Sequence, residues 1–258
     1  NMPSSEAIVL PKTVSPKKYQ LKLQPDFSTF TFQGEETVDI EVVEATTEIA
    51  LNAADLEIAS AVLHRSGTSS ATANITLDDS RQTATLTFTE TIPAGDASLE
   101  ISFTGELNDK LHGSYRSEYT DHQGETRYLA TTQFEATDAR RAFPCWDEPA
   151  HKASFDLTLV IPSDLVAISN NPVVEEVAVE GGLKSLRFGE TPVMSTYLLA
   201  FVIGDLVAIH QQANERTNVG IYTTRGKEDQ GRFALDTSVK LLSFFNDYFG
   251  IPYPLEKL

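Results

Sequence analysis

Apolar and polar residues alternate with a period of two along most of the first 200 residues of this chain. A strand with this period has one buried and one solvent-facing side, as in antiparallel sheets. Turn sequences, among them residues 93–96 (PAGD) and 181–182 (GG), separate the runs. The pattern therefore predicts a large, mainly antiparallel β domain. The clearest alternating runs are centred on Leu21, Ile40, Leu86, Ile101 and Leu157.

A helical pattern replaces this alternation near the C-terminal end. Apolar residues spaced 4, 3, 3 and 4 positions apart share one face of a helix, and they are Leu235, Val239, Leu242, Phe245 and Phe249. Gly231 precedes the helix and Gly250 ends it, while residues 219–223 before it have the pattern of a strand. We expect two domains, residues 1–210 and residues 211–258. The second is expected to be truncated, because the apolar face of its helix still needs a partner.

Composition and cysteine content narrow the class of protein. Hydrophobic residues make up 41% and charged residues 22% of the chain, as in ordinary globular proteins. The longest apolar run, residues 197–209, is too short to span a bilayer, which needs about 20 residues. Residues 1–6 lack the pattern of a secretory signal. The single cysteine, Cys145, excludes an internal disulfide and is typical of a reducing compartment. We therefore predict a cytoplasmic protein without a membrane partner.

The charge of the chain is strongly acidic. Its 37 acidic and 20 basic residues give a formal net charge of −17. Nucleic acid is excluded as a partner, because phosphate binding needs a basic surface. An acidic surface attracts cationic groups such as peptide amino termini, and it equally serves to keep a protein soluble.

Residues 131–150 contain the densest set of polar and charged side chains with possible chemistry. Gln133 and Glu135 lie two positions apart, so on an extended segment both face the same side. A fixed carboxylate at the end of a cleft can bind an α-ammonium group through a charge-assisted hydrogen bond, a contribution of about 1.5–3 kcal/mol. A solvated strand face is the simpler interpretation of a Gln-x-Glu pattern taken alone.

The charged residues that follow are expected to support this segment. Arg140, Arg141, Asp147 and Glu148 are predicted to form a salt-bridged loop that holds Gln133 and Glu135 rigid.

Two further side-chain chemistries can be tested on the sequence. A nucleophilic role for Cys145 would need a histidine base, and His151 is six positions away, but a small packed residue is the favoured interpretation. A zinc site of the His-Glu-x-x-His kind needs two histidines four positions apart. None of the five histidines has this spacing, so we predict no metal ligands in this chain.

Residues 131–150 also resemble, almost letter for letter, the signature of the zinc aminopeptidases related to aminopeptidase N and the puromycin-sensitive aminopeptidase. Similar landmarks follow in the order that this family has. They are residues 113–117 (GSYRS), 171–173 (NPV), 191–198 (TPVMSTYL) and 249–254 (FGIPYP). The resemblance extends over essentially the whole chain, and residues 140–149 are most similar to the cytosolic puromycin-sensitive branch.

The resemblance implies a fold and a function. It implies a saddle-shaped β domain to about residue 210, followed by the start of a thermolysin-like α/β catalytic domain that is truncated before the zinc site. If the family's site residues are transferred to the matching positions of this sequence, Glu135 anchors the amino group of the substrate. Gln133 then borders the pocket for the first side chain of the peptide. The parent enzyme would remove amino-terminal residues from peptides, with a zinc ion that polarises the scissile carbonyl and a glutamate as general base. We expect the zinc to belong to the full-length enzyme and this chain alone to be inactive.

Two other classes remain open at this point. The alternating strands also fit a stand-alone β-sandwich binding module. They fit, as well, a structural interaction protein that has an aminopeptidase-like N-terminal part but no catalytic activity. A His-Glu-x-x-His motif downstream would favour the enzyme. Binding that depends on the free amino terminus of a peptide would distinguish the two non-catalytic classes. No oligomeric state is predicted.

Overall fold

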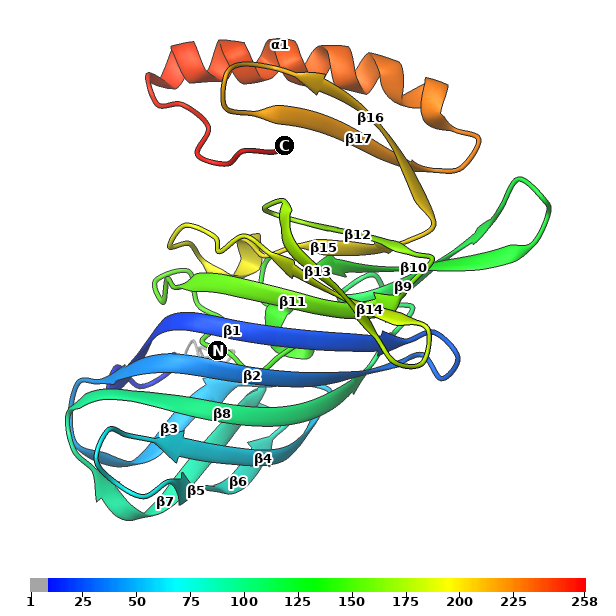
Figure 1. Ribbon diagram of the computed structural model, residues 1–258. Helices are drawn as coiled ribbons and strands as arrows, with labels where there is room; N and C mark the ends of the chain where they lie inside the picture. The colour runs from blue at the N-terminus through cyan, green and yellow to red at the C-terminus, as the bar shows by residue number, and fades with distance from the viewer. Residues whose placement is uncertain (1–8) are drawn as a thin grey trace, which may run out of the picture.

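The computed structural model describes residues 9–258, and it confirms the predicted mainly β fold class (Figure 1). Its largest sheet has eight strands, in which β1 and β11 pair in parallel and the other neighbours pair antiparallel. In spatial order these strands are β13 (Val173–Val179), β14 (Leu183–Phe188), β11 (Ser154–Pro162), β1 (Val14–Asp26), β2 (Thr31–Val42), β8 (Gly95–Glu106), β4 (Leu56–His64) and β5 (Ala71–Thr72).

Two smaller sheets accompany the large one. The three-stranded sheet contains β3 (Thr46–Asn52), β7 (Thr83–Ile92) and β6 (Asn74–Asp78). The four-stranded sheet contains β12 (Val166–Ser169), β15 (Phe201–Gly204), β10 (Thr126–Gln133) and β9 (Gly113–Thr120). Short 3₁₀ turns occur at Ala139–Arg141 and Thr196–Leu198. These three sheets, residues 9–204, share one continuous apolar core, and we call them the β body.

The predicted alternation explains how the β body is held together. In β1, Tyr19, Leu21 and Leu23 are buried, while Gln20 and Lys22 between them are exposed. The inward row of β2 is apolar apart from Glu36, which is also buried. Because most strands turn one row of side chains inward, the sheets bury a common core, although β13 is exposed along its whole length.

The remaining residues, 206–258, form a second and smaller assembly, which we call the C-terminal unit. Strands β16 (Leu206–Gln212) and β17 (Asn218–Thr224) pair antiparallel, and the 3₁₀ turn Glu228–Gly231 leads into helix α1 (Arg232–Phe249). The unit has its own small apolar cluster around Leu235 and Leu242, packed against Val219. In Figure 1, α1 covers the side of the β16–β17 hairpin that faces away from the β body.

The predicted helix is confirmed, and Gly250 ends it in the left-handed conformation with φ 64°. The apolar face of this helix, which is expected to need a further partner, is only partly covered. Leu235 and Leu242 are buried, whereas Phe245 and Phe249 are exposed, because the two-stranded hairpin is too narrow to cover the whole face. The predicted domain limit at residue 210 lies within β16 and remains a prediction.

Among residues 9–258, no helix combines the length and the apolar character that a membrane span requires.

Candidate functional site

Strand β10 ends at Gln133, and the chain then turns through Glu135. Gln133 and Glu135 are both exposed, whereas Phe134 between them is only 2% exposed. The ring of Phe134 packs edge-on against Phe143, with centroids 6.0 Å apart. The two polar side chains therefore lie on the outer side of a segment that a buried aromatic ring fastens to the core.

In the part of the chain that the structure describes, the Glu135 carboxylate has no protein partner. Among residues 9–258, no side chain or backbone N–H donates a hydrogen bond to it, and no cation lies within 4 Å. The nearest polar contact of the segment is a long one, from Gln133 Nε2 to the backbone carbonyl of Glu135 at 3.4 Å. The peptide bond between Glu135 and Ala136 is cis. An exposed carboxylate without a partner is available to accept hydrogen bonds from a cationic ligand.

A turn closed by its own backbone and by Arg141 follows Glu135. The Asp138 N–H donates to the Phe134 carbonyl at 2.9 Å, and Arg141 Nε donates to Asp138 Oδ1 at 2.9 Å. The guanidinium of Arg141 also pairs with the Asp55 carboxylate. Gly113, with φ 65°, lies against this arginine, and a Cβ there would come within 2.8 Å of Arg141 Cβ. The turn that carries Glu135 is thus tied both to itself and to the loop before β4.

Arg140 makes the most deeply buried ion pair of this region. Its Nε donates to Asp147 Oδ2 at 2.9 Å, and its terminal nitrogens donate to the Asp147 carbonyl and to Gln82 Oε1, each at 3.2 Å. Asp147 is 3% exposed, and burial raises the pKa of its carboxyl, while the bonds from Arg140 act in the opposite direction. The Asp147 N–H also donates to Asn52 Oδ1 at 3.0 Å. The loop from Arg140 to Asp147 is thereby fixed to the ends of β3 and β7.

Cys145 lies in the core and has a packing role. It is 0% exposed, its N–H and carbonyl pair with Asn52, and burial raises the pKa of its thiol well above the ordinary value. The neighbouring Trp146 is buried and donates its backbone N–H to the Tyr19 hydroxyl at 3.1 Å. His151 turns toward Glu148 instead, with Nε2 3.6 Å from Oε2. A thiol that is enclosed and protonated, with no histidine beside it, is not a nucleophile.

The four predicted supporting residues do not meet in one charged cluster. Arg140 pairs with Asp147, while Arg141 pairs with Asp138 and Asp55. Glu148 accepts the Leu10 N–H at 2.6 Å and so fastens the start of the described chain. The structure therefore resolves the predicted salt-bridged loop into three separate contacts.

Three partners of this loop are missing from the predictions made on the sequence: Asn52, Asp55 and Gln82. Each lies more than 50 residues before the loop that it contacts. The sequence contains one indication of the role of Asn52, because this polar residue ends an inward-facing apolar run. In the structure Asn52 is 2% exposed. A buried amide of this kind is normally retained for the hydrogen bonds it makes.

Residues 9–258 do not offer a set of metal ligands. Among residues 9–258, no three His, Cys, Asp or Glu side chains come together as metal ligands would. No side chain among residues 9–258 is therefore assigned to zinc, and the roles of Gln133 and Glu135 do not depend on a metal.

Residues 15–198 match the family described as the Peptidase M1 N-terminal domain, and the chain belongs to this family. The resemblance stated on the sequence is thereby confirmed.

Curated relatives agree with this assignment. The chain is 45% identical over 249 residues to aminopeptidase M1-C of Oryza sativa subsp. japonica, covering 96% of this chain and 28% of that protein. It is 40% identical over 250 residues to the puromycin-sensitive aminopeptidase of Caenorhabditis elegans, covering 96% and 26%. It is 41% identical over 249 residues to aminopeptidase N of Acetobacter pasteurianus, covering 96% and 69%. The chain thus spans little more than a quarter of the length of the plant and nematode relatives.

Proposed function

We propose that this chain is the substrate-anchoring β domain of a zinc aminopeptidase, an enzyme that removes amino-terminal residues from peptides. The family of the chain and the names of its relatives support the aminopeptidase class. In this proposal, residues 211–258 begin the catalytic domain and the zinc ion binds beyond them. The single buried cysteine supports a reducing compartment, and we propose the cytoplasm.

Glu135 is proposed to bind the α-ammonium group of the peptide, and Gln133 to border the position of the first side chain. The observation that carries this assignment is the exposed Glu135 carboxylate, which has no partner among residues 9–258 although the turn around it is braced. A carboxylate held in this way loses little entropy when a ligand binds. It also sets a distance, because only the first peptide bond of an anchored chain then reaches a catalytic centre at a fixed position.

The chemistry of the anchor predicts a pH dependence. An α-amino group has a pKa of about 7.7–8.0, so it carries the charge that Glu135 binds only below that range. The affinity of the anchor is expected to fall as the pH rises above about 8. The anchor contributes about 1.5–3 kcal/mol as a charge-assisted hydrogen bond.

The first test replaces Glu135 in the complete enzyme that carries this domain. Glu135→Gln keeps the shape of the side chain but removes its charge, and kcat/KM for a leucyl substrate is expected to fall roughly 10- to 100-fold. Glu125→Gln, at an exposed position in the β9–β10 turn, is the matched control and should leave kcat/KM unchanged. Equal kinetics for wild type and Glu135→Gln would refute the role of the carboxylate.

The second test uses the 258-residue chain alone. Because residues 9–258 provide no metal ligand set, the purified chain is expected not to hydrolyse leucine 4-nitroanilide, with or without added zinc. If an activity that releases 4-nitroaniline co-purifies with the chain, the proposal that the catalytic site lies outside these residues is wrong.

A further inference from the structure

A cavity of about 380 Å³ lies between the C-terminal unit and the β body. One wall is formed by the β16–β17 hairpin and the chain end, and the other by β12 and the loop that follows it. This volume is within the range of small-molecule sites, about 300–1,000 Å³. Neither Gln133 nor Glu135 lines the cavity.

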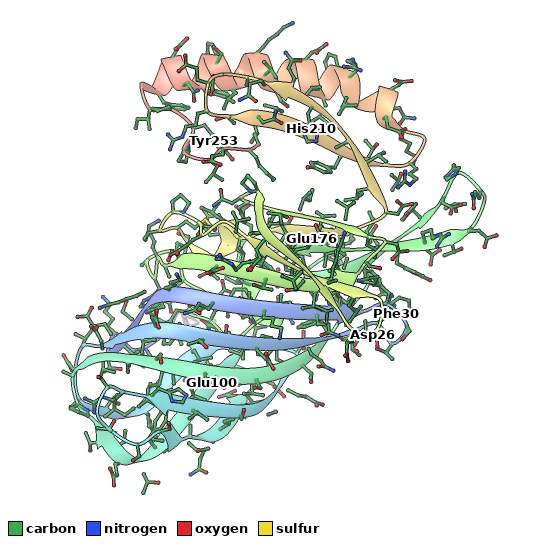
Figure 2. All side chains as sticks on the ribbon, in the orientation of Figure 1. Asp26, Phe30, Glu100, Glu176, His210 and Tyr253 are labelled. Carbon is green, nitrogen blue, oxygen red and sulfur yellow. The ribbon has the colours of Figure 1, made fainter. Side chains whose placement is uncertain are left out.

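Strand alternation explains why the hairpin presents polar side chains to this cavity. Ile209 and Ile221 lie opposite each other and pack into the apolar cluster under α1. His210 and Tyr222, one position on, therefore belong to the other side, and both line the cavity. Figure 2 labels His210 on this hairpin, below α1. The strand partner of His210 is Gly220, where a Cβ would come within 2.8 Å of the imidazole ring.

Two cations without a carboxylate partner line the same cavity. Arg216 lies in the turn between β16 and β17, and Lys257 lies in the chain end. Within residues 9–258, neither side chain forms an ion pair, and Lys257 Nζ donates to the Ser169 carbonyl at 2.5 Å. Burial lowers the pKa of Lys257, so a bound anion would stabilise its charged form. Glu256, which is exposed, is the one carboxylate among the lining residues.

The opposite wall is mainly apolar, with Asn171 as its polar member. Ile168, Val173 and Phe188 line it, and Phe188 is buried. A cavity with an apolar wall facing two basic side chains matches a ligand that has an apolar body and one negative group. In a chain of net charge −17, this local excess of positive charge is unusual.

We propose that this cavity binds a small carboxylate with an aliphatic body. The Arg216 guanidinium donates hydrogen bonds to the carboxylate, Lys257 contributes its charge, and the aliphatic group lies against Ile168, Val173 and Phe188. Because its two walls come from the β body and the C-terminal unit, a bound carboxylate holds these two parts together.

Titration of the 258-residue chain with N-acetyl-L-leucine and with N-acetyl-L-leucinamide tests the proposal. The two probes share an aliphatic body and a blocked amine, so neither depends on Glu135, and they differ only in the negative charge. The dissociation constant, measured by NMR shifts of the backbone amides of residues 209–222, is expected to be at least tenfold lower for the carboxylate.

Variants of the two cations locate the site. Arg216→Gln, at an exposed position, and Lys257→Met are each expected to weaken binding of N-acetyl-L-leucine about tenfold. Lys240→Gln, on the exposed side of α1, is the control and should leave binding unchanged. If Lys257→Met does not fold, the exposed Arg216 still decides the test. Equal binding of the two probes, unchanged binding by Arg216→Gln, or no binding at all would overturn the proposal.

Discussion

The β body keeps its aromatic rings at least partly buried, whereas the C-terminal unit leaves several of its own exposed. In the body, rings such as Phe155 and Trp146 are at most 1% exposed. In the C-terminal unit, α1 shows Phe233, Tyr248 and Phe249 to solvent, at 81%, 71% and 65% exposure. The difference follows from the number of layers: three sheets can cover one another, but a two-stranded hairpin covers only one side of a helix. The contribution of an apolar residue to stability therefore depends on whether another layer of the fold covers it.

The largest expected effect comes from the body. The Phe155 ring is stacked on Tyr19, with centroids 4.8 Å apart. Phe155→Ala is expected to lower the free energy of unfolding by about 3–5 kcal/mol, because it removes a buried ring and leaves a cavity. Urea unfolding monitored by circular dichroism measures this loss. Phe249→Ala, the same change at an exposed site, should shift stability by less than about 0.5 kcal/mol. Similar losses for both variants would remove the contrast between the two regions.

A smaller and more local effect is expected at Leu235 in the C-terminal unit. Leu235 is 0% exposed, but its cluster contains few other buried side chains. Leu235→Ala is expected to weaken α1 by about 2–3 kcal/mol. Hydrogen exchange should then speed up in residues 232–249 while protection in β1 and β2 stays the same. Loss of protection throughout the chain would mean that the two regions unfold together.

The smallest effect comes from Glu36, a polar residue within the body's core. Glu36 is 2% exposed, and neither carboxylate oxygen has a partner among residues 9–258. Tyr19, Cys145 and Asp147 are the neighbouring titratable groups in the same buried region. Burial raises the pKa of Glu36 well above the ordinary 4.5. The unfolded state releases this proton first as the pH rises, so stability is present in acid and is lost above about pH 4.5.

Glu36→Leu removes both the unsatisfied carboxyl and its titration. The variant is expected to be more stable than wild type at pH 7 by about 1–2 kcal/mol. The gain should shrink toward pH 4, which urea unfolding at both pH values measures. Glu36→Gln, which keeps a polar group without a charge, should lie between the two. A less stable Glu36→Leu variant at pH 7 would show that the carboxylate has a favourable role in the core.

Local patterns predicted the elements better than their arrangement. Alternation around Leu21 identified β1, and spacing identified α1, because both periodicities are properties of short segments. The same reasoning predicted that Gln133 and Glu135 face one side of the chain, and both are exposed on either side of the buried Phe134. The parallel pairing of β1 with β11 left no local signal, because the partners Leu21 and Leu157 are remote in the chain.

For the contacts that support the site, the sequence predicted the kind of interaction but not the partners. Arg140 and Arg141 were expected to pair with carboxylates, but the choice between Asp147, Asp138 and Asp55 depends on where distant loops meet. An incompletely covered helix face was expected, but the sequence did not show which of its residues, such as Phe249, would be exposed. Spacing shows which side chains share a helix face, but it does not show how wide the surface beneath that face will be.

The pairing of β1 with β11 also bears on how the protein is made. Strand β1 can pair with β2 as soon as both have been synthesised, but its other edge waits for residues 154–162. Until then, an incomplete sheet with an open hydrogen-bonding edge is present on the ribosome, which is a state prone to wrong pairing. Pairings between distant segments also form slowly, because a long loop must close first. The native order of this sheet therefore cannot form before β11 has been synthesised.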